Sequence, residues 1–374
     1  MTRCWLVALA AWPLAAVSCT DDLPDPGPRD EWDAKLADRV VDYSAALRTA
    51  ALRLTGELPT LAEIRQVGDA PDPARKAAYE AQIDRYLASP RFARQMFRFW
   101  QDTLKLGDDP ALDTAPAFVT KLIVDDRSIL EALTAPSGTC TSYDPSTGFT
   151  AADCRNAPVA VGLLTHPGMN AQFFSNFGFR RVRWLQETFA CTAFPAEIAL
   201  TSTPVGGSEP YTGAFPFTSI AGRASGGRVD FRSTTSVICA NCHSNINHIA
   251  PLFAHFDQAG TYQAQLAVPT PLPDAPPAQL TDYLPPGEPL AWRSGVPVAD
   301  MAALGAAMAA DPDVSACMVA RLWNWALGKS DIVDSSTRVP AQTIEAQVAA
   351  FAASGHRVRG ALRNIFTSDD FVRF

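Results

Sequence analysis

Cys239, Cys242 and His243 form the pattern C-x-x-C-H, the feature that most restricts what this chain can fold into. One turn of helix separates the two cysteines, and the imidazole follows directly. At this spacing two thiols can add to the two vinyl groups of a haem while the adjacent imidazole binds its iron. The motif therefore predicts one covalent c-type haem, with His243 as the proximal iron ligand.

The same five residues have two competing interpretations. A zinc site would need two further ligands, and the sequence has no second C-x-x-C or H-x-x-x-H pair, although His248 and His255 could contribute. A thioredoxin-like redox pair would stand at a helix start within alternating strands and helices. We find no such alternation, so haem c is the favoured cofactor.

The first 18 residues predict export. Arg3 is followed by an apolar run that is too short to form a stable membrane span, as in a secretory signal peptide. The sequence Ala16-Val17-Ser18-Cys19 resembles a bacterial lipobox, which predicts a lipid on Cys19; ordinary cleavage after Ser18 is the alternative. We expect a periplasmic or outer-membrane, cell-surface lipoprotein that contacts the membrane through its lipid anchor only.

The charge of the chain argues against a nucleic-acid partner. The formal net charge is -8, and removal of Arg3 with the leader makes it -9. Phosphate backbones are bound by basic surfaces, which this composition does not favour.

Four of the eight cysteines remain once those of the leader, the lipobox and the C-x-x-C-H motif are set aside. They are Cys140, Cys154, Cys191 and Cys317. In an oxidising compartment we expect them to form disulfides. Cys140 and Cys154 flank a loop of turn-forming residues, which favours pairing them locally and pairing Cys191 with Cys317.

Helix signals dominate the two ends of the chain. Thr60 and Glu63 are spaced as a capping box, and Ser89 precedes Pro90 as an N-cap precedes an N1 proline. We therefore predict an all-α fold with long irregular loops, in which a cytochrome c-like haem module lies between helical modules. The predicted segments are a signal peptide (1–18), a lipid-anchored linker (19–31), an N-terminal helical domain (32–135), a loop-rich central region (136–230), the haem c module (231–266), a proline-rich loop (267–299) and a C-terminal helical domain (300–374).

The second axial ligand of the iron decides what the haem can do. A strong ligand favours electron transfer, whereas an open position admits oxygen or peroxide. Met308, Met301 and His255 are the candidates; His248 is too close in sequence to His243 to reach the opposite face easily. An ordinary core methionine remains the alternative for each methionine.

Two further groups have a possible site role. Arg180, Arg181 and Arg183 could bind haem propionates, although a solvated helix face is the commoner explanation. His166 precedes Pro167 and Gly168, which predicts a capping or surface histidine rather than a catalytic one.

Several stretches of the chain resemble the cytochrome-like proteins best known from planctomycetes and myxobacteria, in which domains of unknown function surround a single C-x-x-C-H. The matching stretches are Leu52–Thr60, Tyr86–Phe92, Gly162–Pro167, Arg183-Trp184, Cys191, Cys239–His243, Asn247–Phe253, Phe256-Asp257, Cys317–Gly328 and Phe366–Phe371. Many relatives have a longer, glycine-containing segment where this chain has Phe253-Ala254-His255. The resemblance implies an exported haem protein in redox work beside partner proteins, and it carries residue roles over only to Cys239, Cys242 and His243.

Three functions are compatible with these observations. The first is a lipid-tethered, single-haem electron carrier with a redox partner protein. The second is a haem oxidase or peroxidase with an open distal position, which the size of the chain and its long loops favour. The third is a surface interaction protein with a structural haem. No serine-nucleophile, phosphate-loop or metalloprotease motif supports a hydrolase.

Overall fold

The computed structural model describes residues 37–107, 109–154, 158–192, 246–264, 280–284, 287–330 and 338–374. The chain divides into two units, residues 1–40 and 41–374, and elements α2 to α18 belong to the second unit. The described residues are mainly helical and form two small antiparallel sheets, which confirms the predicted mostly helical fold. Cys19 and the C-x-x-C-H residues Cys239, Cys242 and His243 lie outside the described residues.

The N-terminal helices begin where the sequence places their caps. The Thr60 hydroxyl and the Glu63 carboxylate bind each other's backbone N–H, so the predicted capping box is present. Ser89 caps the helix that begins at Pro90, as predicted. The elements of this part are α2 (Tyr43–Thr55), α3 (Leu61–Gly68), α4 (Asp72–Ala88), α5 (Pro90–Thr103), the 3-10 turn η1 (Pro110–Leu112), α6 (Thr114–Val124) and α7 (Glu131–Thr134).

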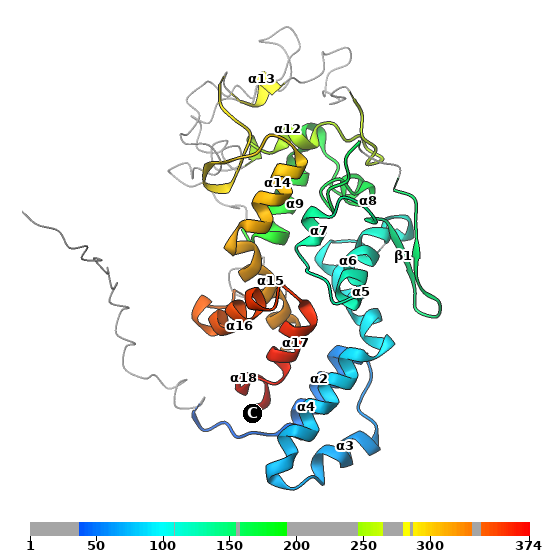
Figure 1. The fold of residues 1–374 in the computed structure, drawn as a ribbon, viewed down its shortest axis with the longest axis vertical. Coiled ribbons are helices and arrows are strands. Elements are labelled where there is room, and N and C mark those ends of the chain that lie inside the picture. Colours follow the sequence, from blue (N-terminus) through cyan, green and yellow to red (C-terminus); the bar gives the residue numbers. More distant parts are fainter. Residues whose placement is uncertain are drawn as a thin grey trace, which may run out of the picture. The chain divides into compact units, whose positions relative to one another are not determined.

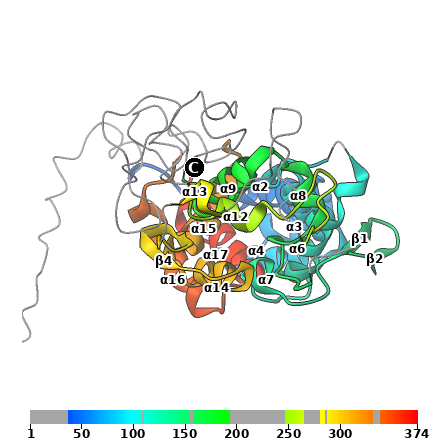
Figure 2. The same cartoon turned by 90° about the horizontal axis from the view of Figure 1, so that it is seen from above.

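The region predicted to be loop-rich contains regular elements. A hairpin of β1 (Thr141–Asp144) and β2 (Gly148–Ala151) extends beyond the helices beside α6 and α7 (Figure 2). Its turn is closed by the Asp144 carboxylate, which accepts hydrogen bonds from the backbone N–H groups of Ser146 and Thr147. The helices α8 (Pro167–Gln172) and α9 (Phe179–Phe189) follow, with the 3-10 turn η2 (Asn176–Gly178) between them. Within the region predicted to be loop-rich, these residues therefore form regular elements.

The C-terminal part returns to the N-terminal helices. The Tyr79 hydroxyl on α4 donates to the Phe366 carbonyl on α17 at 2.7 Å, and Val41 pairs with Arg373 as an isolated bridge. Figure 1 shows α17 and α18 beside α2 and α4, and their buried side chains belong to one continuous core. The elements are α12 (Ala250–Phe253), α13 (Leu280–Tyr283), β3 (Ala291–Trp292), η3 (Arg293–Gly295), β4 (Val296–Pro297), α14 (Met301–Ala310), α15 (Pro312–Ala326), α16 (Ala341–Ala353), α17 (Val358–Phe366) and α18 (Asp369–Val372).

One glycine allows α14 to pack directly on the backbone of α7. A Cβ added to Gly305 would lie 2.2 Å from the Leu133 carbonyl oxygen, closer than any side-chain carbon can approach. This contact sets the position of α14, which carries Met301 and Met308.

Candidate functional site

The segment that follows the C-x-x-C-H motif is held in one conformation by its own hydrogen bonds. After α12, Phe256 pairs with Tyr262 across a short turn. The Asp257 carboxylate stabilises this turn. It accepts hydrogen bonds from the backbone N–H groups of Ala259 and Thr261 and from the side-chain amide of Gln263. These hydrogen bonds stay within one local turn, so Asp257 is a structural residue.

Arg181 on α9 joins this segment to the rest of the fold. Its side chain is buried, and its guanidinium donates at 2.8–2.9 Å to the backbone carbonyls of Asn170, Phe253, Phe256 and Asp257. Burial lowers the pKa of Arg181 to about 10, so the group is still charged at neutral pH. The idea that Arg181 binds a propionate, and its alternative of a solvated face, are both wrong, because the guanidinium is committed to backbone carbonyls.

A cavity of about 410 Å³ lies against the same segment. Three stretches of chain form it: residues 158–165, residues 251–262 and residues 290–302. Most of its lining side chains are apolar, including Val161, Leu252 and Leu290. His255 and Met301, two of the predicted distal ligands, both line it.

His255 is fixed by two contacts. Its Nδ1 lies 3.0 Å from the Gln263 carbonyl oxygen, and its ring stacks on that of Tyr262 with centroids 5.3 Å apart. A carbonyl oxygen only accepts hydrogen bonds, so Nδ1 carries the proton and Nε2 keeps its lone pair in the neutral ring. Metal-binding histidines are commonly oriented by a hydrogen bond of this kind from the other ring nitrogen.

The other predicted ligands differ in their surroundings. Met301 is the first residue of α14, whose N-cap Asp300 accepts a hydrogen bond from Ala303. Met308, two turns further along α14, is fully buried in the core and does not line the cavity. His248 is also buried, and its Nε2 lies 3.0 Å from the Glu288 carboxylate. The cavity therefore brings together His255 and Met301, and separates them from Met308 and His248.

The side chains around the cavity fit a haem group. Imidazole and thioether are the usual second axial ligands of c-type haem iron, and apolar walls suit the macrocycle. The volume is within the range of cofactor and ligand pockets in proteins. Tyr262 and Gln263, which hold His255, carry no motif and could not be identified from the sequence.

Two disulfides are present, and they are the predicted pairs Cys140–Cys154 and Cys191–Cys317. The second joins Cys191, two residues after the end of α9, to Cys317 within α15. His166 caps α8 as predicted, since its Nδ1 accepts from the Gly168 N–H at 3.1 Å, but the ring is fully buried rather than at the surface.

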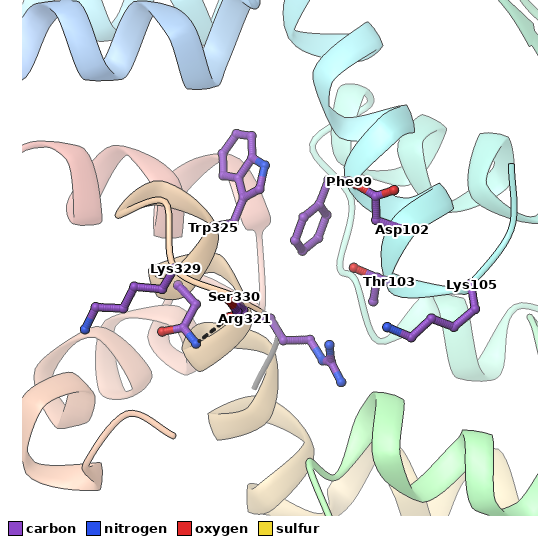
Figure 3. Close-up of a pocket in the computed structure, with 9 residues that line it drawn as sticks. Phe99, Asp102, Thr103, Lys105, Arg321, Trp325, Lys329 and Ser330 are labelled. Carbon is purple, nitrogen blue, oxygen red and sulfur yellow. Dashed lines mark hydrogen bonds between the residues drawn. The ribbon is translucent and has the colours of Figure 1, made fainter. Parts of the chain in front are cut away.

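A second hollow, of about 170 Å³, lies between the C-terminal ends of α5 and α15. Figure 3 shows Lys105 and Arg321 pointing toward it from opposite sides, whereas Lys329 points away. The Arg321 guanidinium donates to the carbonyls of Glu187 and Thr188 at the end of α9, which gives it a structural role. The hollow is lined by no imidazole or thioether, so it is a poorer match to the predicted haem.

Among the residues that the structure covers, no three His, Cys, Asp or Glu side chains are grouped as a metal site. In the same part of the chain, no helix is long and apolar enough to span a membrane.

The fold and the cavity define a mostly helical, disulfide-bonded protein with an oriented imidazole beside an apolar pocket. The family model PSCyt2, described as a protein of unknown function (DUF1549), matches residues 33–119, which run from before α2 into α6. This match agrees with the predicted resemblance to cytochrome-like proteins over that stretch, and it does not reach residues 239–243. No curated protein and no solved structure matches the chain.

Proposed function

We propose that this chain is an exported, lipid-anchored protein with a single c-type haem that transfers electrons to a redox partner protein. The observation that carries the proposal is the C-x-x-C-H sequence at Cys239–His243 in a chain that begins with a signal-peptide pattern. Support comes from the segment directly after the motif, which packs against a cavity lined by His255 and Met301.

The described residues suit an electron carrier because buried hydrogen bonds and a disulfide link their elements to one another. A bound haem would supply a one-electron couple at its iron. The apolar side chains around the cavity would make the surroundings of such a group less polar, which influences its potential. Arg181 ties the segment to α8 and α9, and the Cys191–Cys317 disulfide ties α9 to α15. His255 and Met301 offer the kind of second ligand that favours electron transfer over ligand activation.

The proposal is tested by expression with the native leader in a bacterium that matures c-type cytochromes. We expect a pyridine haemochrome assay to find one covalent haem per chain, and a potentiometric titration to find one reversible one-electron step. The Cys239→Ser/Cys242→Ser variant should lose the haem. A matched control, Cys140→Ser/Cys154→Ser, also removes two cysteines but should keep it.

Three results would contradict the proposal. If the wild-type protein has no covalent haem, the proposal that this chain carries haem c is refuted. Rapid turnover of peroxide would favour the oxidase or peroxidase function. A redox-silent haem would favour a structural role. The anchor is tested separately: wild-type protein should sediment with membranes, and Cys19→Ser should release it.

A further inference from the structure

We infer that the Cys140–Cys154 disulfide is a thiol–disulfide exchange site, at which a dithiol protein attacks Cys154 and Cys140 leaves as a thiolate. The inference goes beyond the proposed function and does not depend on a haem. It is carried by two buried side chains, His166 and Thr139, each of which lies within hydrogen-bonding distance of one of the two sulfur atoms.

The two cysteines differ in their accessibility. Cys140 is buried, whereas Cys154 is partly exposed. Cys140 directly precedes β1 and Cys154 follows β2 by three residues, so their bond closes the base of the hairpin that extends beyond the helices (Figure 2). Exchange begins when a thiolate attacks one sulfur of a disulfide, and access helps to decide which sulfur is attacked. An external thiol should therefore attack Cys154.

His166 is placed to stabilise the thiolate that leaves. Its Nε2 lies 3.5 Å from Cys140 Sγ, and its Nδ1 accepts from the Gly168 N–H, so the hydrogen of the neutral ring is on Nε2. The ring is fully buried, and burial lowers its pKa to about 3, so it donates as a neutral imidazole. Hydrogen bonds to ionised acceptors are stronger than those to neutral ones. The bond from His166 therefore strengthens as Cys140 leaves, which favours attack on Cys154.

Thr139 has the corresponding position at the other sulfur. Its hydroxyl lies 3.2 Å from Cys154 Sγ, and the hydroxyl is the donor because a disulfide sulfur carries no hydrogen. The Thr139 side chain is buried. It can therefore donate to Cys154 when this sulfur leaves as a thiolate in the second step of the exchange.

The exchange has two steps, and its electrons balance. In the first step the attacking sulfur forms a mixed disulfide with Cys154, the Cys140–Cys154 bond breaks, and Cys140 takes the electron pair. In the second step the partner's other thiolate attacks the partner sulfur of the mixed disulfide, and Cys154 leaves with the electron pair. The partner's dithiol is oxidised to a disulfide, and Cys140 and Cys154 are reduced by two electrons. The two protons that the partner's thiols release pass to these cysteines or to solvent.

The Cys191–Cys317 disulfide provides a comparison within the same molecule. It also joins a partly exposed cysteine, Cys191, to a buried one, Cys317. Here the buried sulfur lies 3.5 Å from the Thr188 carbonyl oxygen, to which Arg321 Nε donates. A carbonyl oxygen has no hydrogen to donate and would repel a thiolate at Cys317. Exchange should therefore be slower at this disulfide than at Cys140–Cys154.

The test treats the full chain with reduced glutathione, whose single thiol can carry out the first step. Samples are quenched with acid, free thiols are blocked, and the peptides are identified by mass spectrometry. We expect Cys140–Cys154 to open about tenfold faster than Cys191–Cys317, with glutathione on Cys154 and the blocking reagent on Cys140. Equal rates, or glutathione on Cys140, would overturn the inference.

His166→Asn removes the donor at Cys140. The asparagine Oδ1 can still accept from Gly168, but the side chain has no atom at the position of Nε2. Opening of Cys140–Cys154 should be roughly tenfold slower in this variant, while opening of Cys191–Cys317 keeps its wild-type rate and reports that the chain is folded. An unchanged rate at Cys140–Cys154 in the folded variant would overturn the role of His166.

Thr139→Val is the second variant, and it removes the donor at Cys154 only. Its first step should keep the wild-type rate. In equilibrium with a thioredoxin-type dithiol protein, the ratio of the reduced Cys140 and Cys154 pair to its disulfide should fall about tenfold relative to the wild type. An unchanged ratio, or a wild-type protein that the dithiol protein does not reduce, would overturn the exchange site even if His166→Asn fails to fold.

Discussion

His166 shows how a buried titratable residue can be tied to one protonation state. Nδ1 accepts a hydrogen bond from Gly168, so the proton of the neutral ring is on Nε2, which lies 3.5 Å from Cys140 Sγ in the first disulfide. A second proton would have to bind at Nδ1, where it would break the helix cap. Burial lowers the pKa of His166 from 6.5 to about 3.

This shift predicts a loss of stability in mild acid. Between pH 6.5 and 3 the unfolded chain binds a proton at His166 that the folded chain does not bind, so the free energy of unfolding falls as the pH falls through this window. The slope is about 1.4 kcal/mol per pH unit, or about 2 kcal/mol between pH 6.5 and pH 5. Urea unfolding at pH 7.5, 6.5 and 5 measures it.

The matched variant is His166→Asn, because the asparagine Oδ1 can accept from Gly168 as Nδ1 does but cannot titrate. It should be less stable than the wild type at neutral pH, since it leaves space around the disulfide, and its stability should decline less steeply with acid. His356 and the carboxylates are present in both proteins, so the difference in slope isolates His166. Equal slopes would refute the assignment.

At the scale of elements, the sequence predicts those features that depend on interactions between residues close together in the chain. The caps at Thr60 and Ser89 act on backbone N–H groups within three residues, so their spacing identifies them. The β1–β2 hairpin was missed because each strand has only four residues, too few for a clear alternation.

The candidate site was harder to predict because its contacts are distant in sequence. The carbonyls that bind Arg181 lie 11 residues before it and 72 to 76 residues after it, and no local pattern marks them. His255 and Met301 could be named as ligand types, but their meeting in one cavity depends on how α14 packs on α7.

Arg181 gives a prediction at this scale. Its replacement by Met should lower the free energy of unfolding by about 3 kcal/mol or more, because carbonyls on α8, at the end of α12 and after α12 would lose a charged donor. Arg183→Met is the control on the same helix: its side chain is 59% exposed and pairs with Glu187, so the change should be within about 1 kcal/mol. Urea unfolding of both variants measures the difference, and similar losses would contradict the structural role of Arg181.

At the scale of the whole molecule, the two disulfides close loops of very different size. Cys140 and Cys154 are 14 residues apart, whereas Cys191 and Cys317 are 126 residues apart and enclose the C-x-x-C-H motif. A cross-link restricts the unfolded chain more strongly when the loop it closes is longer. The second disulfide therefore restricts the unfolded chain across the whole segment that would carry the haem.

The stabilisation that each disulfide contributes can be estimated from the length of the loop it closes. The loop-entropy relation gives about 3 kcal/mol for the Cys140–Cys154 loop and about 5 kcal/mol for the Cys191–Cys317 loop. Cys191→Ser/Cys317→Ser should thus unfold at a lower urea concentration than Cys140→Ser/Cys154→Ser, with the wild type highest. The Cys191–Cys317 bond also joins α9 to α15 beside the hydrogen bond from Arg321 to Thr188, so its loss separates elements that the local disulfide does not connect. The reverse order of midpoints would show that loop length is not what the long disulfide contributes.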